Sequence, residues 1–211
     1  CRQKLALVDG RIRTDVKFPV GFQDVLTLPK TGTRVRMMYD VKGRFTLVKV
    51  GEAEAGIKLC KIMNLIAQTG RVPVAVTHDG RRLRYCSPNL AIGDTVVLDI
   101  KENTVTETIK GKVGRIAMVT GGANRGRIGE VSHIDRHPGA FDIAHLKDEN
   151  GHEFVTRLGN IFFIANNSKD VPITLPKAKG LMTNVVTERE EKMIAAESMR
   201  QKQAAQKKRR N

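Results

Sequence analysis

Residues 119–164, VTGGANRGRIGEVSHIDRHPGAFDIAHLKDENGHEFVTRLGNIFFI, hold the pattern that decides the fold. Three glycines stand within six residues at Gly121, Gly122 and Gly126. Glycine is costly to order, so this cluster needs either dihedrals that other residues avoid or a backbone that a large group approaches closely. The rest of the stretch alternates short strand-like runs with turn residues such as Asn150-Gly151. Four or five short strands in this space predict a small barrel that closes its own edges.

The charge of the chain indicates what could approach those glycines. The 211 residues include 37 Lys+Arg and 22 Asp+Glu, for a formal net charge of +15, and basic residues Arg125 and Arg127 flank Gly126. Such a surplus attracts polyanions, and nucleic acid is the leading partner. A membrane-surface role is the alternative, but no apolar run is long enough to span a bilayer. A tight turn with solvated arginines needs the same glycines. The glycines alone therefore do not distinguish a loop that nucleic acid approaches from an ordinary tight turn.

Cysteine and histidine positions argue against a metal centre. The three cysteines, Cys1, Cys60 and Cys86, form no C-x-x-C pair, which disfavours both a disulfide framework and a zinc ribbon and favours an intracellular protein. His133 and His137 are four residues apart, but a proline and a glycine follow directly, so one helical face does not present both. We expect no metal and no cofactor. The start at Cys1 without Met leads us to expect residues upstream.

Hairpin signals recur through the first half of the chain. Asp9-Gly10 separates KLALV from RIRT, and Lys42-Gly43 separates RVRMMYD from RFTLVKV. In the strand at 34–40, Val35, Met37 and Tyr39 share one face, so we expect the arginines to lie on the opposite, solvated face. Further hairpins are predicted around residues 78–80 and 102–103. The run RRLRY is either a charged strand edge kept soluble or an RNA-binding face.

The C-terminal stretch differs from the rest. Thr187 and Glu190 form a T-x-x-E capping box, and a helix is predicted from about Glu188 to about Lys208. Between Arg189 and Asn211 there are eight basic and three acidic residues. The helix is either solvated and free or bound to a phosphate backbone, because isolated helices of this length are marginal in water.

Two longer stretches carry a family resemblance. LALVDGRIRTDVKFPVGFQDVLTL resembles the last part of an S-four-type RNA-binding domain, and MVTGGANRGRIGEVSHIDRHPG resembles a KOW element. With YDVKGRF and VTHDGRRLRY between them, they resemble the S-four-e family of archaeal and eukaryotic small-ribosomal-subunit proteins from about Arg2 to about Lys179. The helical first half of the S-four domain is absent before Cys1, and the C-terminal stretch is longer and more helical than the family leads us to expect.

The resemblance implies a mostly β fold with a C-terminal α-helix. It implies an S-four domain remnant, a central β domain and an SH3-like KOW barrel. The predicted segments are the remnant at 1–30, the central domain at 31–112, the barrel at 113–168, an extended connector at 169–186 and a basic helix at 187–211.

The resemblance also implies a structural constituent of the small ribosomal subunit in the cytoplasm, which binds rRNA and supports assembly and translation. Its expected partners are small-subunit rRNA and neighbouring ribosomal proteins, with no membrane, no small-molecule substrate and no homo-oligomer. The glycine loop would let rRNA come against main chain while its arginines pair with phosphates. The residues expected to bind RNA are Arg11, Arg13, Lys17, Lys42, Arg44, Arg81, Arg82, Arg84, Gly122, Asn124, Arg125, Arg127, Arg136, His137, Arg157, Arg200, Lys202, Lys207, Lys208, Arg209 and Arg210.

Two other classes of function compete with this reading. S-four domains also occur on RNA-modifying enzymes, but Asp40 is the only aspartate in a motif-like setting and a turn explains it better. The chain has no GxxxxGK[ST] loop, and no serine is marked as a nucleophile. We therefore expect no catalytic residues. A KOW-bearing transcription-elongation or RNA-modification accessory factor is the other candidate, and it would carry an acidic region that this basic chain lacks.

Overall fold

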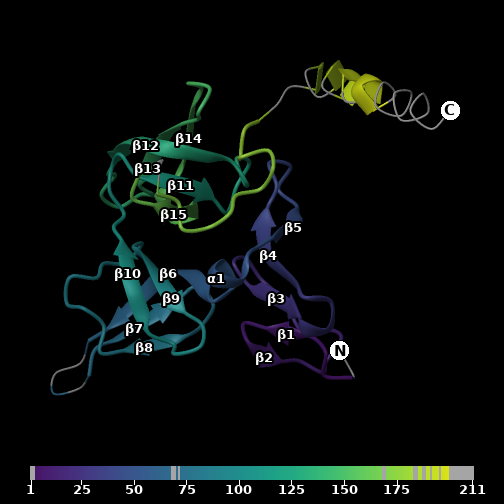
Figure 1. Ribbon diagram of the computed structural model, residues 1–211. Coiled ribbons are helices and arrows are strands. Elements are labelled where there is room, and N and C mark those ends of the chain that lie inside the picture. Colours follow the sequence, from purple (N-terminus) through teal and green to yellow (C-terminus); the bar gives the residue numbers. More distant parts are fainter. Residues whose placement is uncertain are drawn as a thin grey trace. The chain divides into compact units, whose positions relative to one another are not determined.

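The structure is a computed structural model of the 211-residue chain. It describes residues 3–67, 70, 72–167 and 170–182 and, further on, 185–186, 189–190, 192–194 and 196–199. The described part is mainly β, as predicted, and divides into two compact units, Cys1–Leu181 and Met182–Asn211 (Figure 1). Among the described residues, no helix is both long and apolar enough to cross a bilayer.

The first sheet has the strand order β2-β1-β3-β4-β5. Asp9 and Gly10 take positive φ values of 47° and 72°, the combination that a two-residue type I′ hairpin turn requires. The pairing of β3 with β4, in register Val25↔Arg36, carries this sheet across the boundary predicted at residue 30. Its elements are β1 Leu7–Val8, β2 Arg11–Ile12, β3 Val25–Leu28, the 3-10 turn η1 Pro29–Thr31, β4 Thr33–Tyr39 and β5 Phe45–Lys49.

The central sheet follows a single helical turn, α1 Glu52–Ala55, and has the order β10-β9-β6-β7-β8. Its longest strand, β6, pairs with β9 along one half and with β7 along the other, with a register shift between Ile62 and Asn64. The predicted hairpins around residues 78–80 and 102–103 are both present. The strands are β6 Ile57–Ile66, β7 Val74–Thr77, β8 Arg82–Arg84, β9 Thr95–Asp99 and β10 Val105–Ile109.

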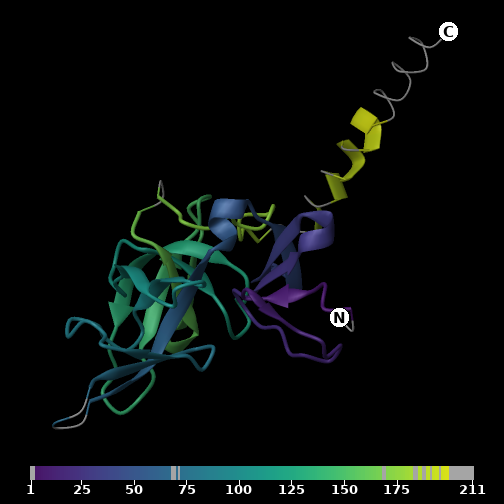
Figure 2. The ribbon, with the colours of Figure 1, turned by 60° about the horizontal axis from the view of Figure 1, so that its bottom comes forward.

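The third sheet contains the glycine-rich stretch and has the order β14-β13-β12-β11-β15. A 3-10 turn, η2 Leu158–Asn160, interrupts the run that continues from HEFVTR to IFFI, so that β15 returns to pair with β11. Figure 2 shows the strands of the three sheets from a second direction. The strands here are β11 Ile116–Val119, β12 Ile128–Asp135, β13 Ile143–Lys147, β14 Glu153–Arg157 and β15 Ile161–Ala165.

One hydrophobic cluster draws on all three sheets. Met38 of β4, Leu59 of β6 and Phe162 of β15 are all buried in it. Phe22 stacks on Tyr39 and meets Phe162 edge-on, with ring centroids 5.0 Å apart in both pairs. Aromatic pairs in these geometries add to the free energy gained by burial. The cluster therefore fixes the first sheet against the other two.

Strand β4 buries the face that its sequence predicted to be solvated. Arg36 and Met38 are fully buried, whereas Val35 and Met37 are half-buried. The Arg36 guanidinium donates through Nη2 to the carbonyl oxygens of Glu54 and Ile57, both at 2.8 Å. The expectation that this face is charged and solvated is wrong, because α1 and the start of β6 supply acceptors for a buried arginine.

The C-terminal unit is helical wherever it is described between residues 185 and 199 (Figure 1). This agrees with the predicted helix up to Met199. Thr187 of the capping box, and the whole segment from Arg200 to Asn211, lie outside the described residues. The connector before it contains Ile173 and Pro176, which are buried against the rest of the first unit.

Candidate nucleic-acid interface

The glycine-rich loop joins β11 to β12 and meets another loop of the same chain. Gly126 has φ +85°, and a Cβ atom built there would lie 1.9 Å from the carbonyl oxygen of Asp40. Asp40 precedes the turn between β4 and β5, so the close approach at Gly126 is made by protein main chain. This corrects the expectation that the glycine is needed for rRNA. Gly122 has φ +78° and remains exposed.

The two arginines of the loop have different environments. Arg127 is 9% exposed, its Nη2 donates to Asp148 Oδ2 at 2.5 Å, and its guanidinium lies 3.8 Å from the centroid of the Phe154 ring. Arg127 is therefore buried against the third sheet, which argues against its predicted contact with phosphate. Asn124 is also held by the third sheet, since its Nδ2 donates to the carbonyl of Val155 in β14 at 3.0 Å.

Arg125 is partly buried and packs against the β4–β5 turn. Its guanidinium carbon lies 5.3 Å from the centroid of the Tyr39 ring, and its stem packs against Gly43. The glycine loop and this turn enclose a groove, which we call the loop groove, lined in part by Lys42, Gly122 and Arg125. Arg44 is close in sequence and its side chain is 72% exposed. The structure thus brings together predicted residues that lie about eighty positions apart.

A second groove, of about 700 Å³, lies between the first and central sheets. We call it the arginine groove, because it is lined by Arg11 and Arg13 from the first hairpin and by Arg81 and Arg82 from β8 and the turn before it. The Arg13 guanidinium stacks on Phe18 at 4.2 Å from the ring centroid. Arg11 and Arg82 are exposed. Sequence reasoning selected all four arginines but did not predict that they would share one groove.

The floor of the arginine groove is an ionic cluster that sequence reasoning missed. The Lys58 side chain is 1% exposed, and its Nζ lies 2.6 Å from oxygens of both Asp9 and Asp24 and 3.0 Å from Asp79 Oδ2. Burial alone would lower the pKa of Lys58, but the three carboxylates outweigh it and hold that pKa above its usual value. Arg81 Nη2 donates to Asp9 and Arg81 Nε to Asp79, each at 2.7 Å. We call these five residues the Lys58 cluster.

This cluster explains why Arg81 differs from its neighbours. Its guanidinium is already committed to two carboxylates, whereas the adjacent Arg82 is exposed. Asp9 and Asp79 each stand in a turn, where the sequence pattern accounted for them by backbone geometry alone. A carboxylate in a turn gives no sign of a lysine 49 positions away, so the pairing of Asp9 with Lys58 had no sequence signal.

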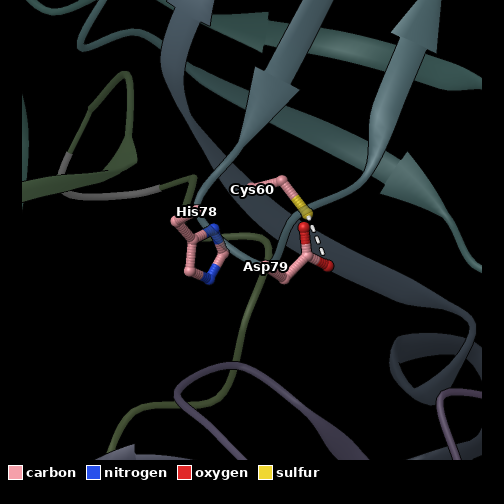
Figure 3. A group of neighbouring side chains, drawn as sticks. All are labelled: Cys60, His78 and Asp79. Atoms are coloured by element: carbon pink, nitrogen blue, oxygen red, sulfur yellow. Dashed lines mark hydrogen bonds between the residues drawn. The ribbon is translucent and has the colours of Figure 1, made fainter.

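In the described part of the chain, one group of three possible metal ligands lies close together: Cys60, His78 and Asp79 (Figure 3). Burial, and next the charge of Asp79, raises the pKa of the Cys60 thiol to about 12, so the sulfur keeps its proton at neutral pH. His78 Nδ1 accepts from the Lys61 backbone N–H at 3.2 Å. The Asp79 carboxylate is engaged by Lys58 and Arg81. These three side chains therefore do not fit a cation, because each donor atom is protonated or already paired.

The other predicted residues fall outside the two grooves. Lys17 and Arg84 are exposed, and Arg84 lines a separate cleft beside Tyr85. Arg136 and His137 are exposed in the loop after β12. Arg157 ends β14 and stacks on Phe141. The six basic residues predicted in the C-terminal segment lie outside the described residues: Arg200, Lys202, Lys207, Lys208, Arg209 and Arg210.

Comparison with known proteins covers most of the chain. The family model described as Ribosomal family S4e matches residues 31–105, the KOW motif matches 113–147, and the model described as 40S ribosomal protein S4 C-terminus matches 148–196. Among solved structures, the chain is similar to the 30S ribosomal protein S4e from Thermoplasma acidophilum. The two are 27% identical with a TM-score of 0.70, over 82% of this chain and 85% of that one. The β4–β5 turn, β8 and the glycine loop all lie within the matched segments.

Proposed function

The chain belongs to the ribosomal S4e family of small-subunit ribosomal proteins, and from this premise we propose that it binds small-subunit rRNA and supports assembly of the subunit. Membership in this family makes it a structural protein of the ribosome and not an enzyme, as the sequence analysis expected. We further infer that it works in the cytoplasm with neighbouring ribosomal proteins as partners.

The observation that carries the RNA-binding proposal is the convergence of arginines on the arginine groove. Arg11 and Arg82 come from different sheets, are both exposed and line the same groove. The Arg13 guanidinium is already held against the Phe18 ring, which limits the freedom that it would lose on binding. Guanidinium groups match phosphate oxygens through paired N–H donors, so a phosphate backbone is the ligand that suits this groove.

The loop groove supports the same proposal at a second place. Exposed Gly122 leaves main chain accessible beside Arg125, and Arg44 and Lys42 add charge on the other side. Phosphate contacts of this kind fix orientation without reading sequence. Together the two grooves offer several phosphate contacts, in keeping with a net charge of +15.

Salt-dependent binding tests the proposal. We expect affinity for a small-subunit rRNA fragment to fall with salt by about 0.7–0.9 log units per phosphate contact for each tenfold increase. The double variant Arg11→Gln/Arg82→Gln should lower that slope by the amount that about two phosphate contacts contribute. Its thermal unfolding should be unchanged. Lys30→Gln, which removes an exposed charge outside both grooves, is the matched control and should lower the slope by less.

Two results would count against the proposal. One is an affinity that does not change between low and physiological salt. The other is a slope that Lys30→Gln lowers as much as the arginine variants do. Sedimentation of the protein with RNA polymerase and not with small subunits would instead support a transcription-elongation role.

A further inference from the structure

A third groove, of about 430 Å³, has a different chemistry from the two basic ones. It lies between β6 and the loop before β9 on one side and the end of the third sheet on the other. We call it the apolar groove. Its defining residues are Lys61, Met63, Ile92, Phe141, Arg157 and Asn160.

Three of the residues that line the apolar groove are large, exposed hydrophobic residues. Met63 is 53% exposed, Ile92 is 64% exposed and Phe141 is 67% exposed. Single exposed hydrophobic residues are common on protein surfaces, but several gathered in one concavity mark a binding site more often than chance. Here they come from three separate segments of the chain, so the fold has assembled the groove from parts distant in sequence.

The polar groups of the groove are mainly cationic. The Arg157 guanidinium lies 4.3 Å from the centroid of the Phe141 ring. Lys61 is 9% exposed, and its Nζ donates to the carbonyl oxygens of Gly159 and Ile161 at 2.8 and 2.6 Å. One carboxylate, Asp142, also lines the groove, and its Oδ1 already accepts from the His137 backbone N–H at 3.1 Å. The groove thus combines exposed apolar side chains with positive charge.

We propose that the apolar groove binds an unpaired nucleobase of the small-subunit rRNA, stacked on the Arg157–Phe141 pair and bordered by Ile92 and Met63. Every base offers a flat face to an aromatic ring or a guanidinium plane, and single-stranded nucleotides are held in this way. While its face stacks, the in-plane N–H donors of Arg157 would be available to a phosphate. An apolar side chain of a neighbouring protein would fill the same space but would leave those donors without an anion.

This inference rests on the proposed function and adds base contact to phosphate contact. The test compares two fluorescent decamers of equal charge, an oligoadenylate and an abasic ribose-phosphate, by anisotropy at fixed salt. We expect the full protein to bind the oligoadenylate about fivefold or more tightly than the abasic probe. Phe141→Ala should weaken oligoadenylate binding by a similar factor and leave abasic binding unchanged. Thermal unfolding of the variant confirms that it remains folded.

Matched controls separate this groove from the others. Tyr85→Ala removes a more exposed aromatic ring that lies outside the apolar groove, and it should change neither affinity. Arg11→Gln should weaken both probes alike, because it acts on phosphates. If Tyr85→Ala lowers oligoadenylate binding as much as Phe141→Ala does, stacking is not a property of this groove and the inference fails.

The remaining outcomes distinguish failure of the inference from failure of the proposed function. Equal binding of both probes with no effect of Phe141→Ala overturns the inference and leaves phosphate-mediated RNA binding intact. Binding of neither probe at low salt overturns both. If Phe141→Ala leaves both probes unaffected but reconstituted subunits lose a neighbouring protein, the groove binds protein and the nucleobase assignment is wrong.

Discussion

Gly126 shows how one missing side chain allows two loops to pack. Its left-handed φ already disfavours other residues, and the Asp40 carbonyl occupies the place of a Cβ atom. The neighbouring backbone hydrogen bond, from Gly126 N to Val119 O at 2.8 Å, holds the loop in this position. Backbone strain and steric overlap with Asp40 would therefore both oppose any side chain at position 126.

We expect Gly126→Ala to destabilise the protein by several kcal/mol, of which about 1 kcal/mol is backbone strain and the rest is steric overlap. The control is Gly139→Ala, because Gly139 has a similar φ of +82° but no heavy atom within 4 Å of the position that a Cβ atom would take. Urea unfolding of both variants separates the two contributions. Equal losses would mean that the contact with Asp40 carries no cost. Arg125→Ala should change stability by much less than Gly126→Ala.

Lys61 is a buried cation whose nearest partners are carbonyl oxygens. Burial lowers its pKa to about 8 from 10.5. Between these two pH values the unfolded chain binds a proton that the folded protein has lost, so the stability contributed at this position rises with pH.

We compare wild type with Lys61→Met by denaturant unfolding from about pH 7 to 10.5. The free energy of unfolding of wild type minus that of the variant should increase by up to about 3 kcal/mol over this range. Other titrating groups are common to both proteins and cancel in the difference. A difference that stays flat with pH would show that the lysine titrates normally when folded.

At the scale of elements, the Lys58 cluster ties two sheets together. Lys58 belongs to β6 of the central sheet, whereas Asp9 and Asp24 belong to the turns of the first sheet. Three carboxylates facing one ammonium and one guanidinium leave little tolerance for loss of either cation. The contact between the sheets therefore depends on charge balance as well as on the hydrophobic cluster.

We expect Lys58→Met to cost about 3–5 kcal/mol, because it removes a buried cation and leaves three partly shielded carboxylates without their central partner. Lys49→Met, at an exposed position of β5, should stay within about 0.5 kcal/mol of wild type. Thermal and urea unfolding measure both. A loss for Lys58→Met no larger than that for Lys49→Met would contradict this account of the cluster.

The strands and their hairpins could be predicted from the sequence better than the contacts between distant segments. The Asp9-Gly10 and Lys42-Gly43 turns fixed two hairpins, because turn residues and alternation are local signals. The burial of Arg36 and Arg127 could not be predicted in this way, since their acceptors on α1 and at Asp148 lie 18 to 21 residues away. The arginine groove had the same limit, because composition indicates charge but not which strands bring it together.

At the scale of the whole molecule, positive charge is spread over both compact units. From Arg200 to Asn211 there are six basic residues and no acidic ones. A segment of this composition gains little from burial and much from a polyanion. We propose that this segment binds rRNA phosphates or an acidic neighbouring protein in the assembled subunit.

Truncation after Met199 tests this role. We expect a modest loss of incorporation into reconstituted small subunits and a smaller salt slope for rRNA binding, with unchanged thermal unfolding of the sheets. A matched variant keeps the length but replaces the six basic residues by glutamine, and it should behave as the truncation does. Unchanged incorporation of both would indicate a solvated helix.

The Lys58 cluster also sets an order of events during synthesis. A ribosome adds about 5–20 residues per second, so on the order of 2–7 s pass between Asp24 and Lys58. During that time the carboxylates of the first sheet have no lysine partner until β6 emerges. We expect chains stalled before residue 58 to be cut by protease between β1 and β3, and chains stalled well beyond residue 81 to resist. The carboxylates of the first hairpin thus stay hydrated at first. The hairpin therefore remains accessible to protease until later residues of the same chain neutralise them.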